Sequence, residues 1–576
     1  MDRRSLIALV TIAAGLTGCR CGQDLPGNGD AAISDAGDSG AGGLDAGPFD
    51  GGPPDGGPPF ELDGGVFTCG RWGAPARPFD EGDGGARRGA LAGPFELPLL
   101  DGGSFSFRAS FTGCDVSVFV PGSLTVSSAS GAASVWDSDG DLRDLVDRSP
   151  PNARYFFVSR AATAQAAAAQ AAAMQGRVDA VLAALPEARR EHWRGRLIVS
   201  GLRAAELQGW LPEAFAGAGS AGFAIDRRQR LRGLGSFSDV TRFRSSLQMQ
   251  SLWPWESNLA LAAYEVDAWN LVEADALAAE RDPGQRVAIL EQALVSVQQD
   301  VSVEIPKTSG ISQADALQVE VALECPDPGR AELVSCGAWD RLARLELLDG
   351  ADGGTAEIAR FVTPFHREAR WKADATPLLA RLGQGGPFTF RWSHAPSFAP
   401  QPTVVSVGLR FLSHALGRSP SSVVHLFSGG TLDGTYNQRA PVDVPIPATA
   451  KRVELWATIS GHGNDAFQCG EFCDHQHAFT VGTATFTLSF PDAGSQDGCV
   501  PRRERGMTPN QGGTWWFGRG GWCPGAVVEP AVFDVTSAVT PGNGARVTYR
   551  ATLGGNPLPD AGQGFADVEA RLVVFE

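Results

Sequence analysis

The chain has 576 residues, too many for a single hydrophobic core, and its length predicts roughly three or four domains. Its formal net charge is −17 and no block of clustered Lys and Arg stands out, which argues against a nucleic-acid-binding protein. Hydrophobic residues make up 43% of the chain, so most of it is expected to fold.

The N-terminus has the features of an export signal. Two arginines precede an apolar stretch at 5–16, and Leu16-Thr17-Gly18-Cys19 resembles a bacterial lipobox. The apolar stretch is too short to remain in a bilayer as a spanning helix. We therefore expect a signal peptide at 1–18 and a lipid on Cys19 that anchors the chain in the bacterial cell envelope, at the outer-membrane surface or in the periplasm. A plain secretory signal is the alternative.

Residues 19–65 consist mainly of Gly, Asp, Ala and Pro. Such a segment buries too little apolar surface to offset the entropy of ordering it. We expect a flexible acidic tether between the lipid anchor and the folded part of the chain.

The ten cysteines of an exported chain predict disulfides. Cys69 and Cys114 are candidates for a disulfide in the domain that follows the tether. That pairing would leave Cys21 without a partner cysteine in the tether. The last six fall into neighbouring pairs: Cys325 and Cys336, Cys469 and Cys473, and Cys499 and Cys523. Spacing alone does not fix their connectivity.

Residues 66–284 are predicted to form an α/β accessory domain. An Ala- and Gln-rich helix is expected at 161–184 and a second helix at 258–279. Short apolar strands are expected at 104–109, 115–120, 155–159, 197–199 and 223–226. Alternating elements of this kind favour a partly parallel sheet, loosely like a thioredoxin-type domain. The domain has no Cys-x-x-Cys, so we expect a supporting or recognition role rather than redox activity.

The remainder of the chain is predicted to be β-structure. Short strands punctuated by Gly, Pro and Asp are expected at 318–323, 344–348, 388–392, 404–412, 452–459, 484–490 and 546–553. This pattern is typical of sandwiches and jelly rolls. Because roughly 290 residues exceed one such unit, we predict two in tandem, at 285–415 and 416–576.

A candidate site lies at 467–477, where Cys469 and Cys473 are four positions apart. A disulfide between them would close a very small ring and hold the carboxylate of Glu471 in a fixed direction. Fixed geometry is what acid–base catalysis requires. The alternative is a stapled loop whose acid simply faces water.

A second candidate is Trp339-Asp340-Arg341, which follows Cys336 closely. The adjacent cation favours an ionised carboxylate, and the indole offers a face for a sugar ring. The alternative for this group is a surface Asp–Arg pair at the start of a strand.

These motifs occur in the order found in one family: Cys325-Pro326; Cys336-x-x-Trp339-Asp340-Arg341; Ala359-Arg360-Phe361-Val362-Thr363-Pro364-Phe365; Ile459-Ser460-Gly461; Cys469-Gly470-Glu471-Phe472-Cys473; His477; Gly498-Cys499; and Arg519-Gly520-Gly521-Trp522-Cys523-Pro524-Gly525. Together they resemble the bacterial peptide-N-glycosidase F family, glycoamidases that remove N-linked glycans, over about residues 290–576. The resemblance implies two eight-stranded jelly rolls with the site in the groove between them. It also implies the disulfides Cys325–Cys336, Cys469–Cys473 and Cys499–Cys523.

The resemblance assigns roles residue by residue. Asp340 matches the principal catalytic acid of the family, and Glu471 matches its partner carboxylate. Two carboxylates can divide the activation of water and the departure of nitrogen when the amide between Asn and N-acetylglucosamine is cut. Substrate-binding roles are implied for residues that border the site: Trp339, Arg341, His462, Trp515, Arg519 and Trp522. The three tryptophans could equally be packing residues. No metal or organic cofactor is implied.

The chain departs from the family in one respect that bears on activity. A third acid is expected on a strand of the first jelly roll, where this sequence places Ser393. Either His394 or a displaced acid substitutes, or activity is reduced. His462 and Asn464 also differ from the Trp-Gly-His segment of the family, so substrate preference is expected to have shifted.

Two other functions stay open. Tandem jelly rolls also occur in copper-dependent peptidylglycine and dopamine hydroxylases, and His475, His477 and Met507 could imitate their His-x-His plus Met site. A second copper would need three more histidines, and the first jelly roll offers only scattered ones: His366, His394 and His414. The blander alternative for the His-x-His pair is hydrogen-bonded loop residues beside the Cys469–Cys473 ring. The other function is a non-catalytic glycan- or partner-binding surface lipoprotein.

The sequence therefore favours a lipid-anchored glycoamidase. Its expected partners are N-linked glycoproteins or glycopeptides, from which hydrolysis would give Asp and a glycosylamine. We expect a monomer that contacts the membrane through Cys19 and binds no nucleic acid.

Overall fold

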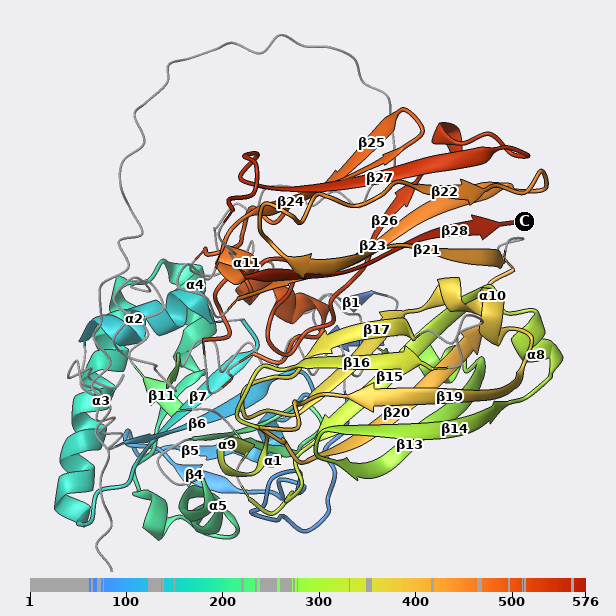
Figure 1. Ribbon diagram of the computed structural model, residues 1–576. Helices are drawn as coiled ribbons and strands as arrows, with labels where there is room; N and C mark the ends of the chain where they lie inside the picture. The colour runs from blue at the N-terminus through green and yellow to red at the C-terminus, as the bar shows by residue number, and fades with distance from the viewer. Residues whose placement is uncertain are drawn as a thin grey trace, which may run out of the picture.

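The computed structural model places most of the chain beyond residue 77 (Figure 1). The residues it describes are 62–63, 66–69, 74–75, 77–122, 136, 139–149, 151–218, 222–233, 236–238, 256–258, 272, 275–276, 278–330, 332–348, 355–415, 419–463, 469–495, 498–509, 511, 514–560 and 564–576. The predicted signal peptide, the lipidation site and all but two residues of the predicted tether lie outside them. Among the described helices, none is both long and apolar enough to cross a membrane.

The N-terminal region contains a five-stranded sheet with the order β10-β9-β6-β7-β8. Strand β6 is parallel to β7 and β7 to β8, whereas β9 is antiparallel to β6 and to β10. The bounds are β6 (Val116–Gly122), β7 (Ala153–Ser159), β8 (Leu197–Val199), β9 (Phe223–Ile225) and β10 (Leu231–Gly233). Fully buried apolar runs in the central strands are expected where helices cover both faces of a sheet.

Helices accompany this sheet: α2 (Asp139–Arg148), α3 (Ala164–Ala184), α4 (Glu187–Arg194) and α5 (Leu211–Gly217). Helix α3 lies within the predicted 161–184 helix because its alanines favour helix and Thr163 caps its first turn, accepting from the N–H of Ala166 at 3.2 Å. The chain leaves the helix before Pro186, which a helix interior would not accommodate.

The predicted strand at 104–109 is only half correct. Strand β5 stops at Ser106, and α1 (Phe107–Ser110) follows. The Ser106 hydroxyl accepts from the N–H of Ala109 at 3.4 Å and so caps the helix, a local effect that overrides the strand propensity of the phenylalanines. The predicted helix at 258–279 falls largely outside the described residues, and Glu256–Asn258 form strand β12.

The other short elements of this region are β1 (Leu62–Asp63), β2 (Val66–Cys69), β3 (Ala74–Pro75), β4 (Glu96–Pro98), β5 (Ser104–Ser106), η1 (Ala204–Glu206) and β11 (Ser236–Ser238). Strands β1, β2 and β3 form a separate three-stranded sheet, and β4 pairs with β5.

The first jelly roll consists of two four-stranded antiparallel sheets. One sheet has the order β13 (Gln285–Val295), β20 (Thr403–Leu412), β15 (Ala316–Glu324) and β18 (Ala369–Asp374). The other has the order β14 (Gln298–Ile305), β19 (Gly386–Ser393), β16 (Leu342–Leu347) and β17 (Ala356–Val362). Short helical turns connect them: α8 (Ser309–Ser312), α9 (Glu332–Ser335), η4 (Thr376–Leu378) and α10 (Leu379–Leu382).

The second jelly roll repeats this architecture. One sheet has the order β21 (Pro420–Thr431), β28 (Phe565–Phe575), β23 (Arg452–His462) and β26 (Ala531–Asp534), and the other β22 (Val442–Pro445), β27 (Gly544–Leu553), β24 (His475–Val481) and β25 (Ala484–Leu488). Its helical turns are α11 (Cys469–Phe472), η5 (Val500–Arg505) and η6 (Thr536–Ala538). The predicted pair of antiparallel β-units is confirmed. Figure 1 shows the second jelly roll (orange to red) packed over the first (green to yellow).

Alternating hydrophobicity explains how each sandwich forms its core. In β15, Leu317, Val319, Val321 and Leu323 are buried, and the residues between them are half-buried. Successive side chains of a strand point to opposite faces, so this period of two directs one face of the sheet into the core.

Arg360 connects the two jelly rolls from the middle of β17. Its side chain is 1% exposed and donates to the Ser460 hydroxyl at 2.9 Å and to the Asp567 carbonyl at 2.6 Å, both in the second jelly roll. Its guanidinium also pairs with Glu357 at 2.9 Å in its own strand and with the Asp567 carboxylate at 3.1 Å. A fully satisfied buried guanidinium of this kind fixes the relative position of the two sandwiches.

We predict that Arg360→Ala destabilises the protein by about 3–5 kcal/mol, because it removes the buried one of the two cations that pair with Glu357 and Asp567, together with its hydrogen bonds across the interface. Urea unfolding followed by tryptophan fluorescence measures the effect. The matched control is Arg391→Ala, which removes a 2.7 Å pair with Asp300 that is 31% and 42% exposed and is expected to cost at most about 1 kcal/mol. Equal losses for the two variants would contradict the assigned role of Arg360.

Candidate functional site

Glu471 is presented by the small ring that the sequence predicted. A disulfide joins Cys469 to Cys473, and Glu471 lies between them in α11. The carbonyl of Glu471 accepts from the N–H of Gly520 at 2.7 Å, and the carbonyl of Gly520 accepts from the N–H of Gly461 at 2.7 Å. The ring is therefore fixed to two neighbouring segments, and the direction of its carboxylate is restricted.

Close packing around the ring explains the glycines in these motifs. A Cβ on Gly461 or on Gly520 would come within 2.1 Å of the His475 ring nitrogen Nε2. Only glycine lets the backbone approach the imidazole so closely at both positions.

Asp340 comes from the first jelly roll, between the Cys325–Cys336 disulfide and strand β16. The residues on either side of it are held by Thr363. The Thr363 hydroxyl donates to the Trp339 carbonyl at 2.7 Å and accepts from the N–H of Arg341 at 2.8 Å. One threonine thus fixes the backbone before and after the carboxylate.

Arg519 brings the two carboxylates together. Its Nε donates to Glu471 Oε1 at 2.8 Å, and its Nη2 lies 3.6 Å from Asp340 Oδ2. The Arg519 side chain is 2% exposed, whereas Asp340 and Glu471 are 19% and 17% exposed. Carbonyls of Thr514 and Phe517 accept from its Nη1 at 3.1 and 3.0 Å. A buried cation thus lies between two acids that keep access to solvent.

This environment changes the acidity of both carboxyls. Burial raises the pKa of Asp340 to about 7; Arg519 opposes the rise, and the negative charge of Glu471 adds to it. Burial also raises the pKa of Glu471, against the effect of Arg519. Asp340 therefore exchanges its proton near neutral pH, as acid–base catalysis requires.

Three of the predicted substrate-binding residues border this pair with some exposed surface. Trp339 is 45% exposed, and the Arg341 guanidinium lies over its ring at 5.7 Å. His462 is half-buried, and its Nε2 forms a hydrogen bond of 2.9 Å with the Ser460 hydroxyl. An exposed indole beside a carboxylate is a suitable contact for a sugar ring.

Trp515 and Trp522 are packing residues. Trp515 has no exposed surface and packs with Met507 and the Cys499–Cys523 disulfide, which agrees with the packing alternative rather than with contact to substrate. Trp522 is 6% exposed; its ring stacks on His462 at 5.0 Å and lies 4.8 Å from the Arg519 guanidinium. It supports residues of the site from beneath rather than facing a ligand.

Phe565 borders the site and was not predicted from the sequence. Its ring is 42% exposed and lies 5.3 Å from that of His462, and its backbone N would lie 2.9 Å from a Cβ on Gly470. It therefore lies next to the disulfide-closed ring that presents Glu471, although 94 positions separate the two residues (565 − 471). A single phenylalanine at the start of an ordinary strand gives no sequence signal for this position.

His394 does not replace the missing third acid. It has no exposed surface; its Nδ1 accepts from Trp392 Nε1 at 3.0 Å, and its Nε2 donates to the Gln401 carbonyl at 2.8 Å. Burial lowers its pKa, which keeps the ring neutral. Ser393 pairs in register with Arg344, whose guanidinium binds Glu357 and Asp567, so these two carboxylates are engaged in ion pairs.

The copper alternative fails on geometry. His475 and His477 lie on strand β24 with no exposed surface. A hydrogen bond of 2.6 Å joins His475 Nδ1 to His477 Nε2, and another of 2.6 Å joins His477 Nδ1 to the Tyr549 hydroxyl. Met507 packs in a different cluster with Trp515. The three side chains therefore do not form a ligand set. The histidines are hydrogen-bonded as the blander alternative proposed, but within a strand rather than a loop.

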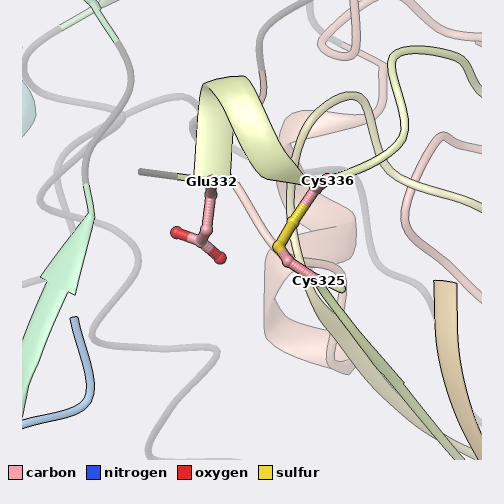
Figure 2. A group of neighbouring side chains, drawn as sticks. All are labelled: Cys325, Glu332 and Cys336. Carbon is pink, nitrogen blue, oxygen red and sulfur yellow. A yellow bond between two sulfur atoms is a disulfide. The ribbon is translucent and has the colours of Figure 1, made fainter. Parts of the chain in front are cut away.

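Among the described residues, one group of Cys and Glu side chains lies close enough to suggest a metal site: Cys325, Glu332 and Cys336 (Figure 2). The two sulfurs are joined in a disulfide and are not available as thiolates. Glu332 is engaged by Arg88 at 3.6 Å and by Arg367 at 3.2 Å. The chemistry of these groups does not fit a metal site.

The comparisons with known proteins agree with the motifs. Residues 433–566, which include Glu471 and Arg519, match the family model of peptide-N-glycosidase F, C terminal. This segment is therefore similar to the C-terminal part of the peptide-N-glycosidase F family. The resemblance inferred from the motifs is thereby confirmed.

Individual relatives match longer parts of the chain at low identity. The peptide-N(4)-(N-acetyl-beta-D-glucosaminyl)asparagine amidase F of Elizabethkingia miricola is 22% identical over 248 residues, which are 40% of this chain and 66% of the relative, just under two thirds of its length. A crystal structure of a peptide-N(4)-(N-acetyl-beta-D-glucosaminyl)asparagine amidase is 17% identical, with a TM-score of 0.41, and the match covers 51% of this chain and 96% of that one. PNGF-II is 14% identical, with a TM-score of 0.39, covering 53% and 67%.

We predict that replacing Cys469 and Cys473 by serine costs only about 2 kcal/mol of stability, because the loop they close is short. The comparison variant replaces Cys499 and Cys523, which close a loop of sequence separation 24, and is expected to lose about 3.5 kcal/mol. Guanidinium unfolding of both double variants measures the difference. A larger loss for the Cys469 and Cys473 variant would show that the small ring stabilises the fold rather than orienting Glu471.

Proposed function

We propose that the protein is a glycoamidase that hydrolyses the amide between Asn and N-acetylglucosamine in N-linked glycoproteins or glycopeptides, giving Asp and a glycosylamine. The observation that carries the proposal is the bridging of Asp340 and Glu471, from different jelly rolls, by the buried Arg519. The family assignment of residues 433–566 and the name of the Elizabethkingia miricola relative support it.

In the proposed reaction Asp340 is the general base. Its ionised carboxylate takes a proton from water as the oxygen attacks the side-chain carbonyl carbon of the substrate. The resulting acid returns the proton to nitrogen as the C–N bond breaks, so that the amine leaves neutral. A pKa of about 7 suits both steps, because Asp340 binds and releases a proton with little cost near neutral pH.

The neighbouring residues position the substrate. Glu471 holds Arg519 in place through the 2.8 Å hydrogen bond, and its own solvent-accessible surface leaves it free to accept from a sugar hydroxyl or amide. Trp339 offers an exposed ring face for the first sugar, and Phe565 offers a second on the side of Glu471.

We further propose that the chain acts as a monomer at the cell surface or in the periplasm. The lipobox ending at Cys19 supports the anchor, and the acidic 19–65 segment would give the folded part reach. The mixed sheet of the N-terminal region is consistent with an accessory domain of thioredoxin-like type.

The decisive experiment is incubation of a denatured N-glycoprotein with the full chain, with Asn-to-Asp conversion followed by mass spectrometry. We expect Asp340→Asn and Glu471→Gln each to abolish release while the fold is kept. Matched controls are Asp300→Asn and Glu291→Gln, whose carboxylates are 42% and 72% exposed and lie in other strands. Undiminished release by either site variant would contradict the proposed function.

The pH dependence tests the assignment of the base. Because Asp340 must be ionised, kcat/KM is expected to rise about tenfold per pH unit below its pKa of about 7 and to level off above it. Arg519 lowers the pKa of Asp340, so the residual activity of Arg519→Met should show the same rise displaced to higher pH. A profile that falls through neutrality, or a midpoint that Arg519→Met leaves in place, would show that Asp340 is not the base.

A further inference from the structure

A buried ion cluster joins the N-terminal region to the loop that precedes Asp340. The Arg88 side chain, 9% exposed, lies 2.6 Å from Glu368 Oε1 and 3.6 Å from Glu332 Oε1. Arg367, 1% exposed, pairs with the other oxygen of Glu332 at 3.2 Å. Two buried and two half-buried side chains, two arginines and two glutamates, thus lie together, and one of the arginines comes from the N-terminal region.

The cluster contacts the loop closed by the Cys325–Cys336 disulfide at two points, Cys325 and Glu332. Figure 2 shows Glu332 at the start of the short helix α9, with the disulfide at its other end. Glu368 Oε1, which binds Arg88, also accepts from the N–H of Cys325 at 3.1 Å. Removing Arg88 would therefore loosen the loop at Cys325, because Glu368 loses its cation, and would leave Glu332 held by Arg367 as its one remaining cation.

A second contact comes from strand β10. The Gly233 carbonyl accepts from Arg367 Nη2 at 3.2 Å, and a Cβ on Gly233 would lie 3.1 Å from Glu332 Oε2. The N-terminal region therefore meets Glu332 from two sides, through Arg88 and through the backbone of Gly233.

The loop continues directly into the catalytic segment. After Cys336, the Gly337 carbonyl accepts from the N–H of His366 at 2.7 Å, and Thr363 then fixes the backbone on both sides of Asp340. The segment 336–341 therefore lies alongside the segment 363–368, which contains Arg367 and Glu368.

We propose that the N-terminal region is part of the active site's support: Arg88 is a positioning residue that fixes the 326–340 segment, and with it Asp340, through Glu332 and Glu368. As a statement about catalysis, this rests on the proposed function. A general base displaced by a fraction of an ångström loses much of its effect, and a buried carboxylate that loses its cation moves toward solvent. This contact gives the N-terminal region a role in the reaction without any residue that touches substrate.

The test uses the full chain and Arg88→Ala, with amide hydrogen exchange of peptides covering 326–340 and 469–477. We expect exchange at least about tenfold faster in the first peptide and unchanged in the second. Arg108→Ala is the matched control: it removes a 2.6 Å pair with Glu81 that is 62% and 57% exposed within the same region, and it should alter neither peptide. Arg88→Lys keeps the charge but has one donor group, and it should give an intermediate rate even if Arg88→Ala folds poorly.

Kinetics on a glycopeptide complete the test. For Arg88→Ala we expect kcat to fall at least about tenfold and KM to stay within about twofold, because the substrate contacts are intact while the base is misplaced. Unchanged exchange at 326–340 in Arg88→Ala would overturn the positioning role, whatever the activity. A wild-type chain that releases no glycan would instead contradict the proposed function, and the exchange data would still decide whether Arg88 fixes the segment.

Discussion

The candidate site depends on one buried guanidinium. Arg519 lies between Asp340 and Glu471, which belong to different jelly rolls and would repel each other in a poorly solvated position without a cation. The contact to Glu471 is short and the contact to Asp340 is longer, so the two carboxyls are not equivalent. This asymmetry, together with burial, leaves Asp340 with a pKa of about 7 and gives one residue of the pair the capacity to move a proton.

Such a site requires the two sandwiches to keep a fixed position relative to each other. Buried ion pairs around the site stabilise that position. Arg360 contacts Ser460 and Asp567 across the interface between the jelly rolls. Arg88, in the N-terminal region, contacts residues that hold the loop before Asp340. The same chemistry, an arginine buried among carboxylates and carbonyls, thus recurs at three junctions. Each fixes the relative position of two segments distant in the sequence, because a guanidinium donates in several fixed directions at once.

Four of the residues that the sequence interpretation considered share a feature in the structure. Trp515, His394, His475 and His477 were considered for substrate, proton or metal chemistry because their residue types suit it, yet all are sealed in packing or internal hydrogen bonds. Residue type and spacing indicate what a side chain could do, whereas solvent access is decided by segments that pack from elsewhere in the chain. Phe565 shows the converse, since its exposed ring reaches the site only because strand β28 pairs with β23.

The sequence by itself determined the alternation that forms the strands, the helix within 161–184 and the motifs that carry the two carboxylates, because these depend on local periodicity and on motifs a few residues long. The three disulfides were implied only by the family resemblance. Only the tertiary structure decided which arginine lies between the acids, how far burial raises the pKa of Asp340, and that Arg88 reaches the loop before it. Distances between residues hundreds of positions apart, and the dielectric around them, are properties of the packed chain, and no local pattern encodes them.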